Sequence, residues 1–337
     1  MSGESGTKIE DIRHKMGGKL SILAHHYQHD SIVRHADYIG DSLELARKIP
    51  NLEAEYIVLC GVFFMAESAA ILAHKGQKVY IPDREAGCLL AGTSPASYLE
   101  RVIKAYTSSG KSIIPLAYVN TSAAIKALCG LYGGSVCTSA NARIMLDWAR
   151  NQGQAVLFLP DKNLGQNTAD QLGLNHKDQE IIHLQEPYFS GEVELYIWPG
   201  LCVIHHFFKT HHIAEVRERF PAAYIIVHPE CSPEVVQASD ASGSTSQIIQ
   251  YVQELPKDSQ VFVGTEINMV SRLKEQFQGD KDVLPLISSA CSNMAKITEI
   301  KLADLLEYID EVPPIEIDRD IQEQAWIALE RMLSICL

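Results

Sequence analysis

Short apolar runs alternate with amphipathic stretches along almost the whole chain, and this alternation restricts the fold more than any other feature of the sequence. Runs that are apolar on both faces are typical of strands buried in parallel sheets, and the stretches between them have helical periodicity. The predicted strands are Leu20–His25, Tyr56–Met65, Lys78–Ile81, Ile113–Val119, Ala155–Leu159, Ala223–Val227, Gln260–Val263 and Val283–Ile287. The predicted helices are Ser42–Lys48, Ser97–Tyr106, Ala140–Asn151, Ser246–Leu255, Lys301–Glu311 and Asp318–Ile335. The pattern predicts an α/β chain with parallel sheets.

A faint internal repeat of element order divides this pattern into three. Each repeat has a strand with a polar end, a hydroxyl residue at a helix start, a second strand with a polar end, and a cysteine after a further strand. The second strand ends are Gly61–Glu67, Leu157–Asn163 and Phe262–Glu266, and the cysteines are Cys88, Cys202 and Cys291. The cysteines are separated by stretches of about 100 residues, which is the usual size of a domain. We therefore infer three similar α/β units, each of which contributes one cysteine to a common point.

Composition excludes several classes of protein. The chain has 337 residues, which by length alone suggests two domains, and 46% hydrophobic with 21% charged residues is ordinary for a globular protein. The formal charge of −13 disfavours a nucleic-acid binder. The longest apolar run stops at Glu67 and is too short to span a bilayer, and residues 1–19 have no apolar signal core. We expect a cytoplasmic protein with no nucleic-acid or membrane partner.

The eight cysteines contain no C-x-x-C motif, so a local zinc or ferredoxin-type motif is excluded. Three thiolates from three units would instead assemble one centre, and the residues alone fit either an iron–sulfur cluster that acts as a Lewis acid or a catalytic zinc. A lone cysteine at a strand end is more often a small buried residue. Cys60 and Cys336 lie in apolar segments and are predicted core residues.

Polar residues follow the first strand of each repeat in pairs two positions apart, a spacing that places both on one face of an extended strand. The pairs are His25 with Tyr27, Tyr118 with Asn120, and His228 with Glu230. Together they provide candidates for proton transfer, although each side chain could equally be a buried, hydrogen-bonded one. The predicted helix starts carry Asp41-Ser42, Thr138-Ser139 and Ser244-Thr245. Such residues either only cap helices or also hold anionic ligands.

A set of ordered motifs gives a more specific interpretation. In chain order they are His25-His26-Tyr27-Gln28, Gly40-Asp41-Ser42-Leu43, Phe64-Met65-Ala66-Glu67, Ala86-Gly87-Cys88, Tyr118-Val119-Asn120-Thr121-Ser122-Ala123, Cys137-Thr138-Ser139-Ala140-Asn141-Ala142, Leu159-Pro160-Asp161-Lys162-Asn163-Leu164-Gly165, Trp198-Pro199-Gly200-Leu201-Cys202-Val203-Ile204-His205, His228-Pro229-Glu230-Cys231, Gly243-Ser244-Thr245-Ser246, Gly264-Thr265-Glu266 and Cys291-Ser292-Asn293-Met294. This set resembles the quinolinate synthase family, and the resemblance extends from about Leu20 to about Glu307.

The resemblance implies three similar three-layer α/β/α domains with parallel sheets, arranged with pseudo-threefold symmetry around a central active site. It implies one [4Fe–4S] cluster held by Cys88, Cys202 and Cys291, with one iron left free for substrate. The family's reaction condenses iminoaspartate with dihydroxyacetone phosphate to quinolinate, phosphate and water, on the route to NAD. An aspartate oxidase or dehydrogenase would supply the unstable iminoaspartate.

Carried over motif by motif, the resemblance also implies the residues of the site. The implied substrate contacts are His25, Ser42, Tyr118, Val119, Asn120, Ser139, His228, Pro229, Glu230 and Thr245. Tyr27 and His205 are expected nearby. The candidates for catalysis are Glu230, Tyr27, Tyr118 and His25.

The expected domains are 1–92, completed by C-terminal helices in 295–337, then 93–203 and 204–294. Two departures from the family pattern predict insertions. One is Cys129–Ser135, which leaves the placement of Ser139 open, and the other lies within Gln166–Tyr196.

Two other functions stay open at the level of sequence. One is a different iron–sulfur hydro-lyase that acts on a related acid, which would not require a phosphorylated triose. The other is a non-enzymatic iron–sulfur or zinc protein such as a redox sensor. A sensor has no need of polar groups such as His25, Tyr118 and His228 at the strand ends, and this favours an enzyme.

Overall fold

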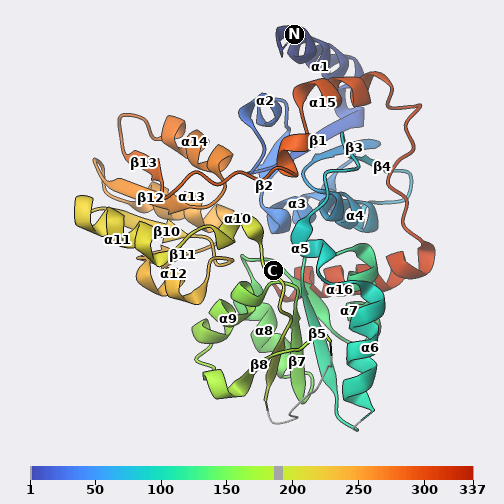
Figure 1. Cartoon of the computed structure of the whole chain (residues 1–337). Coiled ribbons are helices and arrows are strands. Elements are labelled where there is room, and N and C mark those ends of the chain that lie inside the picture. Colours follow the sequence, from blue (N-terminus) through green and yellow to red (C-terminus); the bar gives the residue numbers. More distant parts are fainter. Residues whose placement is uncertain (1, 109, 186–192, 337) are drawn as a thin grey trace.

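Three parallel sheets form the framework of the computed structural model, which describes residues 2–108, 110–185 and 193–336. The sheets belong to three lobes that meet at the centre of the molecule (Figure 1). The first contains β1 (Leu20–His25), β2 (Tyr38–Gly40), β3 (Tyr56–Cys60) and β4 (Lys78–Tyr80) in the order β2-β1-β3-β4. The second contains β5 (Ile113–Tyr118), β6 (Ser135–Cys137), β7 (Ala155–Leu159), β8 (Gln179–Ile181) and β9 (Leu195–Ile197) in the order β6-β5-β7-β9-β8. The third contains β10 (Tyr224–Val227), β11 (Ala241–Ser242), β12 (Gln260–Gly264) and β13 (Asp282–Pro285) in the order β11-β10-β12-β13.

The same strand order recurs in the three sheets, apart from the additional edge strand β8 in the second. We call the three sheets with their helices the first, second and third units. The α/β class and the threefold repeat predicted from the sequence are therefore confirmed. The expected insertion within Gln166–Tyr196 contains β8, the strand that the other two sheets lack; residues 186–192 of that segment lie outside the described part of the chain.

Helices connect the strands and pack around the sheets (Figure 1). The first unit has α1 (Ser2–Met16), α2 (Asp30–Val33), α3 (Ser42–Lys48), α4 (Phe63–Leu72) and α5 (Leu89–Gly92). The second has α6 (Ala96–Thr107), α7 (Ala123–Leu131), α8 (Ala142–Arg150) and α9 (Lys162–Gln171). The third has α10 (Val203–His206), α11 (Thr210–Arg219), α12 (Pro233–Ala238), α13 (Thr245–Glu254) and α14 (Ile267–Gln276), and the chain closes with α15 (Glu299–Glu307) and α16 (Arg319–Ile335). Short 3₁₀ helices are Gly17–Lys19, Ile49–Asn51, His176–Asp178 and Met294–Lys296.

One predicted strand is wrong at its end. The strand predicted over Tyr56–Met65 stops at Cys60, and α4 begins at Phe63, so Glu67 lies on a helix and not at a strand end. Apolar residues fill both the end of β3 and the first turn of α4, and seven of the ten residues of α4 are buried. A continuous apolar run cannot by itself separate a buried strand from a buried helix.

The insertion expected at Cys129–Ser135 has a simple structural cause. Cys129 lies in α7, and this helix is longer than α2 and α12, which follow the corresponding strands of the other units. The expected insertion is therefore an extension of a helix, followed by a turn before β6.

The C-terminal helices pack on two different units. Helix α15 packs against α1 and α2 of the first unit, whereas α16 packs mainly against α7 and β6 of the second and also contacts α4 of the first. The α7–α16 approach is close: a Cβ on Gly130 would lie 1.9 Å from the carbonyl oxygen of Gln324, so glycine is required there. Ser135 Oγ donates to the Ala328 carbonyl 3.0 Å away. The domain bounds expected from the sequence stay a prediction.

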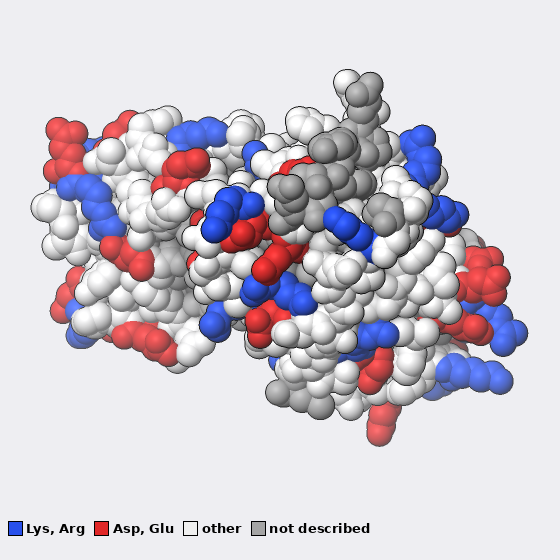
Figure 2. Space-filling model, turned by 90° about the horizontal axis from the view of Figure 1, so that it is seen from below, with Lys and Arg blue, Asp and Glu red and all other residues white. Residues whose placement is uncertain are grey.

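The hydrophobic core joins the first two units and leaves the third separate. One continuous cluster of buried side chains extends through the first and second units and includes residues of α15 and α16. The third unit has two clusters of its own. Within the described ranges, no helix combines the length and apolar character needed to cross a membrane. Acidic and basic side chains are interspersed on the face seen in Figure 2.

Candidate active site

A pocket lies where the three units meet, at the carboxyl ends of β1, β5 and β10. It has a volume of about 880 Å³ including its open mouth. In parallel α/β units this edge of the sheet is where ligands bind. Of the residues predicted from the sequence, those that line it are His25, Tyr27, Ser42, Cys88, Tyr118, Asn120, Ser139, Cys202, His228, Glu230, Thr245 and Cys291. Residues distant in the sequence are therefore brought together at one place.

Val119 and Pro229 are not brought to the pocket wall. Val119 is buried behind it, and its backbone N–H donates to the Cys137 carbonyl at 2.7 Å. Pro229 is buried between two lining residues, and its carbonyl accepts a hydrogen bond from Asn167 at 2.8 Å. Any contact these two residues make with a ligand would have to come from their backbone.

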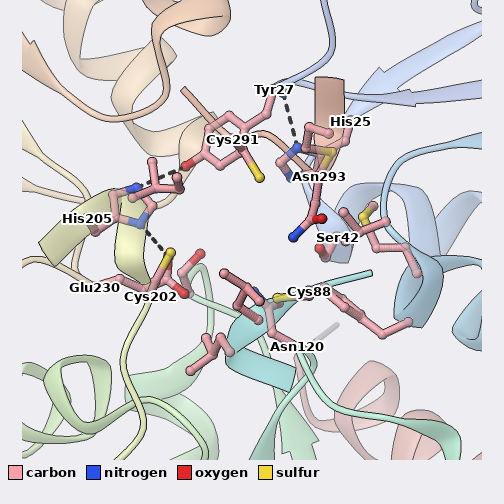
Figure 3. Close-up of a pocket in the computed structure, with 18 of the residues that line it drawn as sticks. His25, Tyr27, Ser42, Cys88, Asn120, Cys202, His205, Glu230, Cys291 and Asn293 are labelled. Atoms are coloured by element: carbon pink, nitrogen blue, oxygen red, sulfur yellow. Dashed lines mark hydrogen bonds and ion pairs between the residues drawn. The ribbon is translucent and has the colours of Figure 1, made fainter. Parts of the chain in front are cut away.

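Three cysteines surround the centre of the pocket (Figure 3). Cys88, Cys202 and Cys291 each follow the strand that occupies the same place in its sheet, namely β4, β9 and β13. They are the partly exposed cysteines, whereas the other five, which are Cys60, Cys129, Cys137, Cys231 and Cys336, are buried. The burial pattern thus singles out the same three cysteines as the sequence repeat.

Backbone N–H groups a few residues further along the same chain segment lower the pKa of each of the three thiols. The donors are Ala91 and Leu90 to Cys88, His205 to Cys202, and Met294 and Asn293 to Cys291. Burial raises the pKa of Cys88 to about 12 and also raises the pKa of Cys202 and of Cys291. Since only thiolates bind metals, a bound metal centre has to displace these protons, and the N–H donors favour the thiolate.

The loops of two of these cysteines are held by acidic residues of their own unit. The N–H of Cys202 donates to Asp161 Oδ2 at 2.9 Å, and the N–H of Cys291 donates to Glu266 Oε1 at 3.3 Å. Asp161 and Glu266 are the N-cap residues of α9 and α14. These two helices follow β7 and β12, the third strand of each unit in chain order. The two cysteine loops are therefore attached to rigid helices by equivalent contacts.

His205 is a site residue that the sequence interpretation placed only in the neighbourhood. It lies on α10, three residues after Cys202, and is almost fully buried in the pocket wall. Its Nδ1 lies 2.7 Å from Glu230 Oε2, and its ring stacks on His228 at 4.3 Å between ring centroids. Ligand atoms of Cys202, His205 and Glu230 all lie within 4.8 Å of one another, so this trio is also a potential set of metal ligands.

Glu230 lies at the centre of a buried group of polar side chains. Its Oε2 is 3.3 Å from His228 Nδ1 as well as 2.7 Å from His205 Nδ1. Within the part of the chain that the structure describes, its other oxygen, Oε1, is buried and has no hydrogen-bond partner. An unpartnered buried carboxylate oxygen is costly, so it marks a position at which a ligand group or a proton is expected.

Tyr27 contacts the third unit from the first. Its hydroxyl lies 2.7 Å from Thr265 Oγ1 and 3.4 Å from His205 Nε2, and Thr265 Oγ1 is also 3.2 Å from that Nε2. Burial raises the pKa of Tyr27 and of Tyr118 well above 10, with the charge of Glu230 as the next cause in both. Both phenols are therefore neutral and able to donate at physiological pH. Thr265 was visible in the Gly264-Thr265-Glu266 motif but had no predicted role.

His25 is held as a neutral imidazole. Burial, together with electrostatic interactions with His26 and Arg272, lowers the pKa of His25 to about 3. The N–H of Tyr27 donates to His25 Nδ1 at 3.1 Å, so the proton of the neutral ring is on Nε2. Its ring also packs edge-on against that of Tyr27, with ring centroids 4.7 Å apart. His25 thus provides a fixed hydrogen-bond donor.

The hydroxyl residues lie at or near helix starts, as expected. Ser42 is the first residue of α3, which Asp41 caps through bonds to the N–H groups of Leu43 and Glu44. Thr245 is the first residue of α13, and its buried Oγ1 has no partner among the described residues. Ser139 lies in a turn before α8, which begins at Ala142 rather than at the predicted Ala140. Two helix starts and one turn therefore present hydroxyl groups to the pocket.

A family model and known proteins match almost the whole chain. The family model described as "Quinolinate synthetase A protein" matches residues 7–334. The chain is 42% identical over 347 residues to a quinolinate synthase of Bacillus cereus (strain Q1), covering 99% of this chain and 94% of the relative. It is 41% identical over 339 residues to a quinolinate synthase of Streptomyces coelicolor, covering 96% of this chain and 86% of the relative.

The chain belongs to the quinolinate synthase family. It is therefore a member of an enzyme family of NAD biosynthesis, and the resemblance noted in the sequence is confirmed. In this quinolinate synthase family member, the pocket at the junction of the three units is the candidate active site.

Proposed function

We propose that the chain condenses iminoaspartate with dihydroxyacetone phosphate to give quinolinate, phosphate and water, and that it does so in the cytoplasm. Membership of the quinolinate synthase family supports the product. The observation that carries the proposal is the convergence of Cys88, Cys202 and Cys291 from equivalent loops of three units on one pocket rich in proton-transfer groups. A purely structural metal site would have no use for such groups.

The three cysteines fit a [4Fe–4S] cluster. Three thiol ligands leave one iron of such a cluster for substrate. Backbone N–H groups that lower the pKa of each thiol favour the thiolate form that a cluster requires. Cys88, Cys202 and Cys291 would hold the cluster. When bound, it supplies a Lewis acid for a substrate oxygen or nitrogen.

The pocket has donors for the two carboxylates of iminoaspartate and for the phosphate of the triose. Ser42 and Thr245 line the pocket as the first residues of α3 and α13, where the helix dipole favours anions. The orphaned Thr245 Oγ1 and the Nε2–H of His25 add further donors. In a chain of net charge −13, local donors of this kind are needed to hold anionic substrates. Asn120, Ser139 and His228 complete the proposed contacts, with the backbone of Val119 and Pro229 behind them.

Enediol formation, phosphate loss and ring closure each require a proton to move. Glu230 is the proposed base, since its Oε1 has no hydrogen-bond partner among the described residues and its Oε2 lies 2.7 Å from His205 Nδ1. Tyr27 and Tyr118 are the proposed acids, because burial keeps both phenols protonated. His25 is the proposed neutral donor to a substrate oxygen. An aspartate oxidase or dehydrogenase is the proposed source of iminoaspartate.

A second candidate rests on the trio Cys202, His205 and Glu230, which could hold a single zinc ion. That arrangement would support a zinc or iron–sulfur sensor, or a hydro-lyase that acts on a related acid without the triose. It leaves Cys88 and Cys291 without a role, whereas the cluster uses all three partly exposed cysteines.

The deciding experiment is anaerobic purification, reconstitution with iron and sulfide, and assay of quinolinate with both substrates. Omission of dihydroxyacetone phosphate separates a condensing enzyme from a hydro-lyase, and metal analysis separates iron from zinc. Protein that carries a full cluster but forms no quinolinate from the two substrates would contradict the proposal.

A further inference from the structure

Three loops that carry pocket residues are held by side chains from a different unit. The loops directly follow β1, β5 and β10, and comprise residues 26–28, 119–122 and 229–231; we call them the pocket loops. They include or adjoin the proposed acids and base. What fixes each loop is therefore part of how the site is built.

Helix α9 of the second unit holds the pocket loop of the third. Asn167 Nδ2 donates to the carbonyls of Pro229 at 2.8 Å and Cys231 at 2.9 Å. Asn163 Nδ2 donates to the Glu230 carbonyl at 3.0 Å. Both asparagines and the three carbonyl-bearing residues are buried. Three successive buried carbonyls around Glu230 are thus satisfied from outside their own unit.

Helix α14 of the third unit holds the pocket loop of the first in the same manner. Arg272 donates to the carbonyl of His26 and, at 3.1 Å, to that of Gln28. Asn268 Nδ2 reaches the Tyr27 carbonyl at 3.4 Å. Again three successive carbonyls, here around Tyr27, accept bonds from one helix of another unit.

The two helices use equivalent positions. In each, an acidic N-cap residue, Asp161 or Glu266, accepts from the N–H of its own unit's cysteine. The asparagine that contacts the loop lies two residues after the cap, and the second donor, Asn167 or Arg272, lies four residues later on the same helix face. One helix therefore contacts a cysteine loop at its cap and the next unit's pocket loop along its side.

Helix α4 of the first unit contacts the region of the pocket loop after β5 in the second unit, but through a carboxylate and an aromatic ring instead of amide and guanidinium donors. Glu67 Oε2 accepts from the N–H of Ala123, the first residue after that pocket loop, at 3.2 Å. Fully buried Lys126 donates to the Thr121 carbonyl of that loop, and its Nζ lies 5.4 Å from the ring centroid of Phe64 on α4. The contacts run from the first unit to the second, from the second to the third, and from the third to the first.

We propose that Asn163, Asn167, Asn268, Arg272 and Glu67 are positioning residues that form a cyclic clamp, in which each unit fixes the pocket loop of the next. The expected effect of the clamp on catalysis rests on the proposed function. Which unit holds the loop of which other unit rests on the contacts alone. The first and second units share a hydrophobic core, whereas the third has its own. The hydrogen bonds of the clamp therefore connect the third unit to the other two. A small displacement of a catalytic group lowers the rate of the chemical step more than it weakens substrate binding.

Because each helix holds a loop of a different unit, a substitution in the clamp should affect that loop alone. A general loss of stability would affect the whole molecule. Hydrogen exchange is measured by peptide in anaerobically purified wild type, Asn167→Ala and Arg272→Met. Loss of the donors leaves carbonyls unpaired, so exchange is expected to rise about 10- to 100-fold in one loop. Asn167→Ala is expected to affect residues 228–232 of the third unit and not 26–28. Arg272→Met is expected to affect 26–28 of the first unit and not 228–232.

Kinetics and matched variants complete the test. Both substitutions are expected to lower kcat about tenfold or more with little change in either KM, while the iron content stays at the wild-type level. Arg272→Lys, which keeps a donor, is expected to recover part of the loss. Exposed Asp170 on α9 and exposed Lys274 on α14 serve as controls, and Asp170→Ala and Lys274→Ala should match wild type.

The outcomes separate the clamp from the proposed function. Exchange that rises throughout the molecule, in the helix's own unit, or nowhere would overturn the clamp, as would a change confined to KM. Wild type that makes no quinolinate would overturn the proposed function. The exchange result would still decide which loop each helix holds. Where Asn167→Ala proves unstable, Asn163→Ala removes a single bond to the same loop and gives the same expected pattern.

Discussion

Nδ1 of His205 lies 2.7 Å from Oε2 of Glu230, and both side chains are almost fully buried. The two residues come from α10 and from the loop after β10, next to one of the converging cysteines. Oε1 of Glu230 has no partner among the described residues. The other ring nitrogen of His205, Nε2, lies near the hydroxyls of Tyr27 and Thr265. A carboxylate oriented in this way is suited to accept a proton from a bound substrate.

Replacing Glu230 by Gln is therefore expected to lower kcat by about 10²- to 10⁴-fold, because the amide keeps the shape but cannot accept the proton. The measurement is quinolinate formation under saturating concentrations of both substrates, with the iron content determined in parallel. Glu234→Gln, on α12 nearby in the chain, is the control. Activity of Glu230→Gln within threefold of wild type would exclude Glu230 as the base.

Replacing Cys88, Cys202 or Cys291 by Ala is expected to abolish activity and to prevent assembly of a complete cluster, because each is one of the three proposed ligands. Cys336→Ala, which alters a buried thiol that contacts Met145 and is not among the residues that line the pocket, should retain both. The readouts are iron and sulfide per chain and the visible absorption of the anaerobic protein. A variant of the three that retains a full cluster would show that its cysteine is not a ligand.

Much of the fold was predictable because strands buried on both faces have continuous apolar runs. Leu20–His25 and Ala155–Leu159 were predicted to the residue, and α3 likewise. The short edge strands β2, β6, β8 and β11 were missed, as was the short strand β9, since they have too few residues for a periodic pattern. The start of α4 was missed because Phe63 and Phe64 continue the apolar run of β3. Such boundaries are decided by tertiary packing.

Much of the site was predictable for a different reason. Residues at the carboxyl ends of equivalent parallel strands must meet at one edge, so the pairs beginning at His25 and His228 could be placed together. The contacts between units could not be predicted in this way. Asn167 and Arg272 are ordinary polar helix residues in the sequence, and their function as donors to another unit's carbonyls follows only from how the units pack.

Removing the hydroxyl of Tyr27 is expected to lower kcat by about 10²-fold, because a neutral buried phenol is a proposed proton donor and its bonds to Thr265 and His205 are lost. Tyr27→Phe keeps the ring and therefore its packing against His25. Tyr308→Phe, at a residue that is 50% exposed, is the control. Steady-state kinetics with both substrates provide the measurement. An unchanged kcat for Tyr27→Phe would show that its hydroxyl takes no part in the chemistry.

The neutral state of His25 makes stability depend on pH. Its pKa in the folded chain is about 3, lowered by burial and by His26 and Arg272, with Glu44 acting in the opposite direction. The unfolded chain has an imidazole pKa of about 6.5, so between these values the unfolded state binds the extra proton. Stability is therefore lost as pH falls below about 6.5, and this residue accounts for about 1 kcal/mol between pH 7 and pH 5.5.

Comparison of wild type with His25→Asn isolates this contribution. Urea unfolding under anaerobic conditions at the two pH values gives the free energy of unfolding for each protein. The variant is expected to be less sensitive to the change in pH by about 1 kcal/mol, since asparagine does not titrate. His14→Asn, at an exposed histidine of α1, should show the wild-type dependence. Equal pH dependence in wild type and His25→Asn would mean that His25 takes up its proton as readily in the folded chain as in the unfolded one.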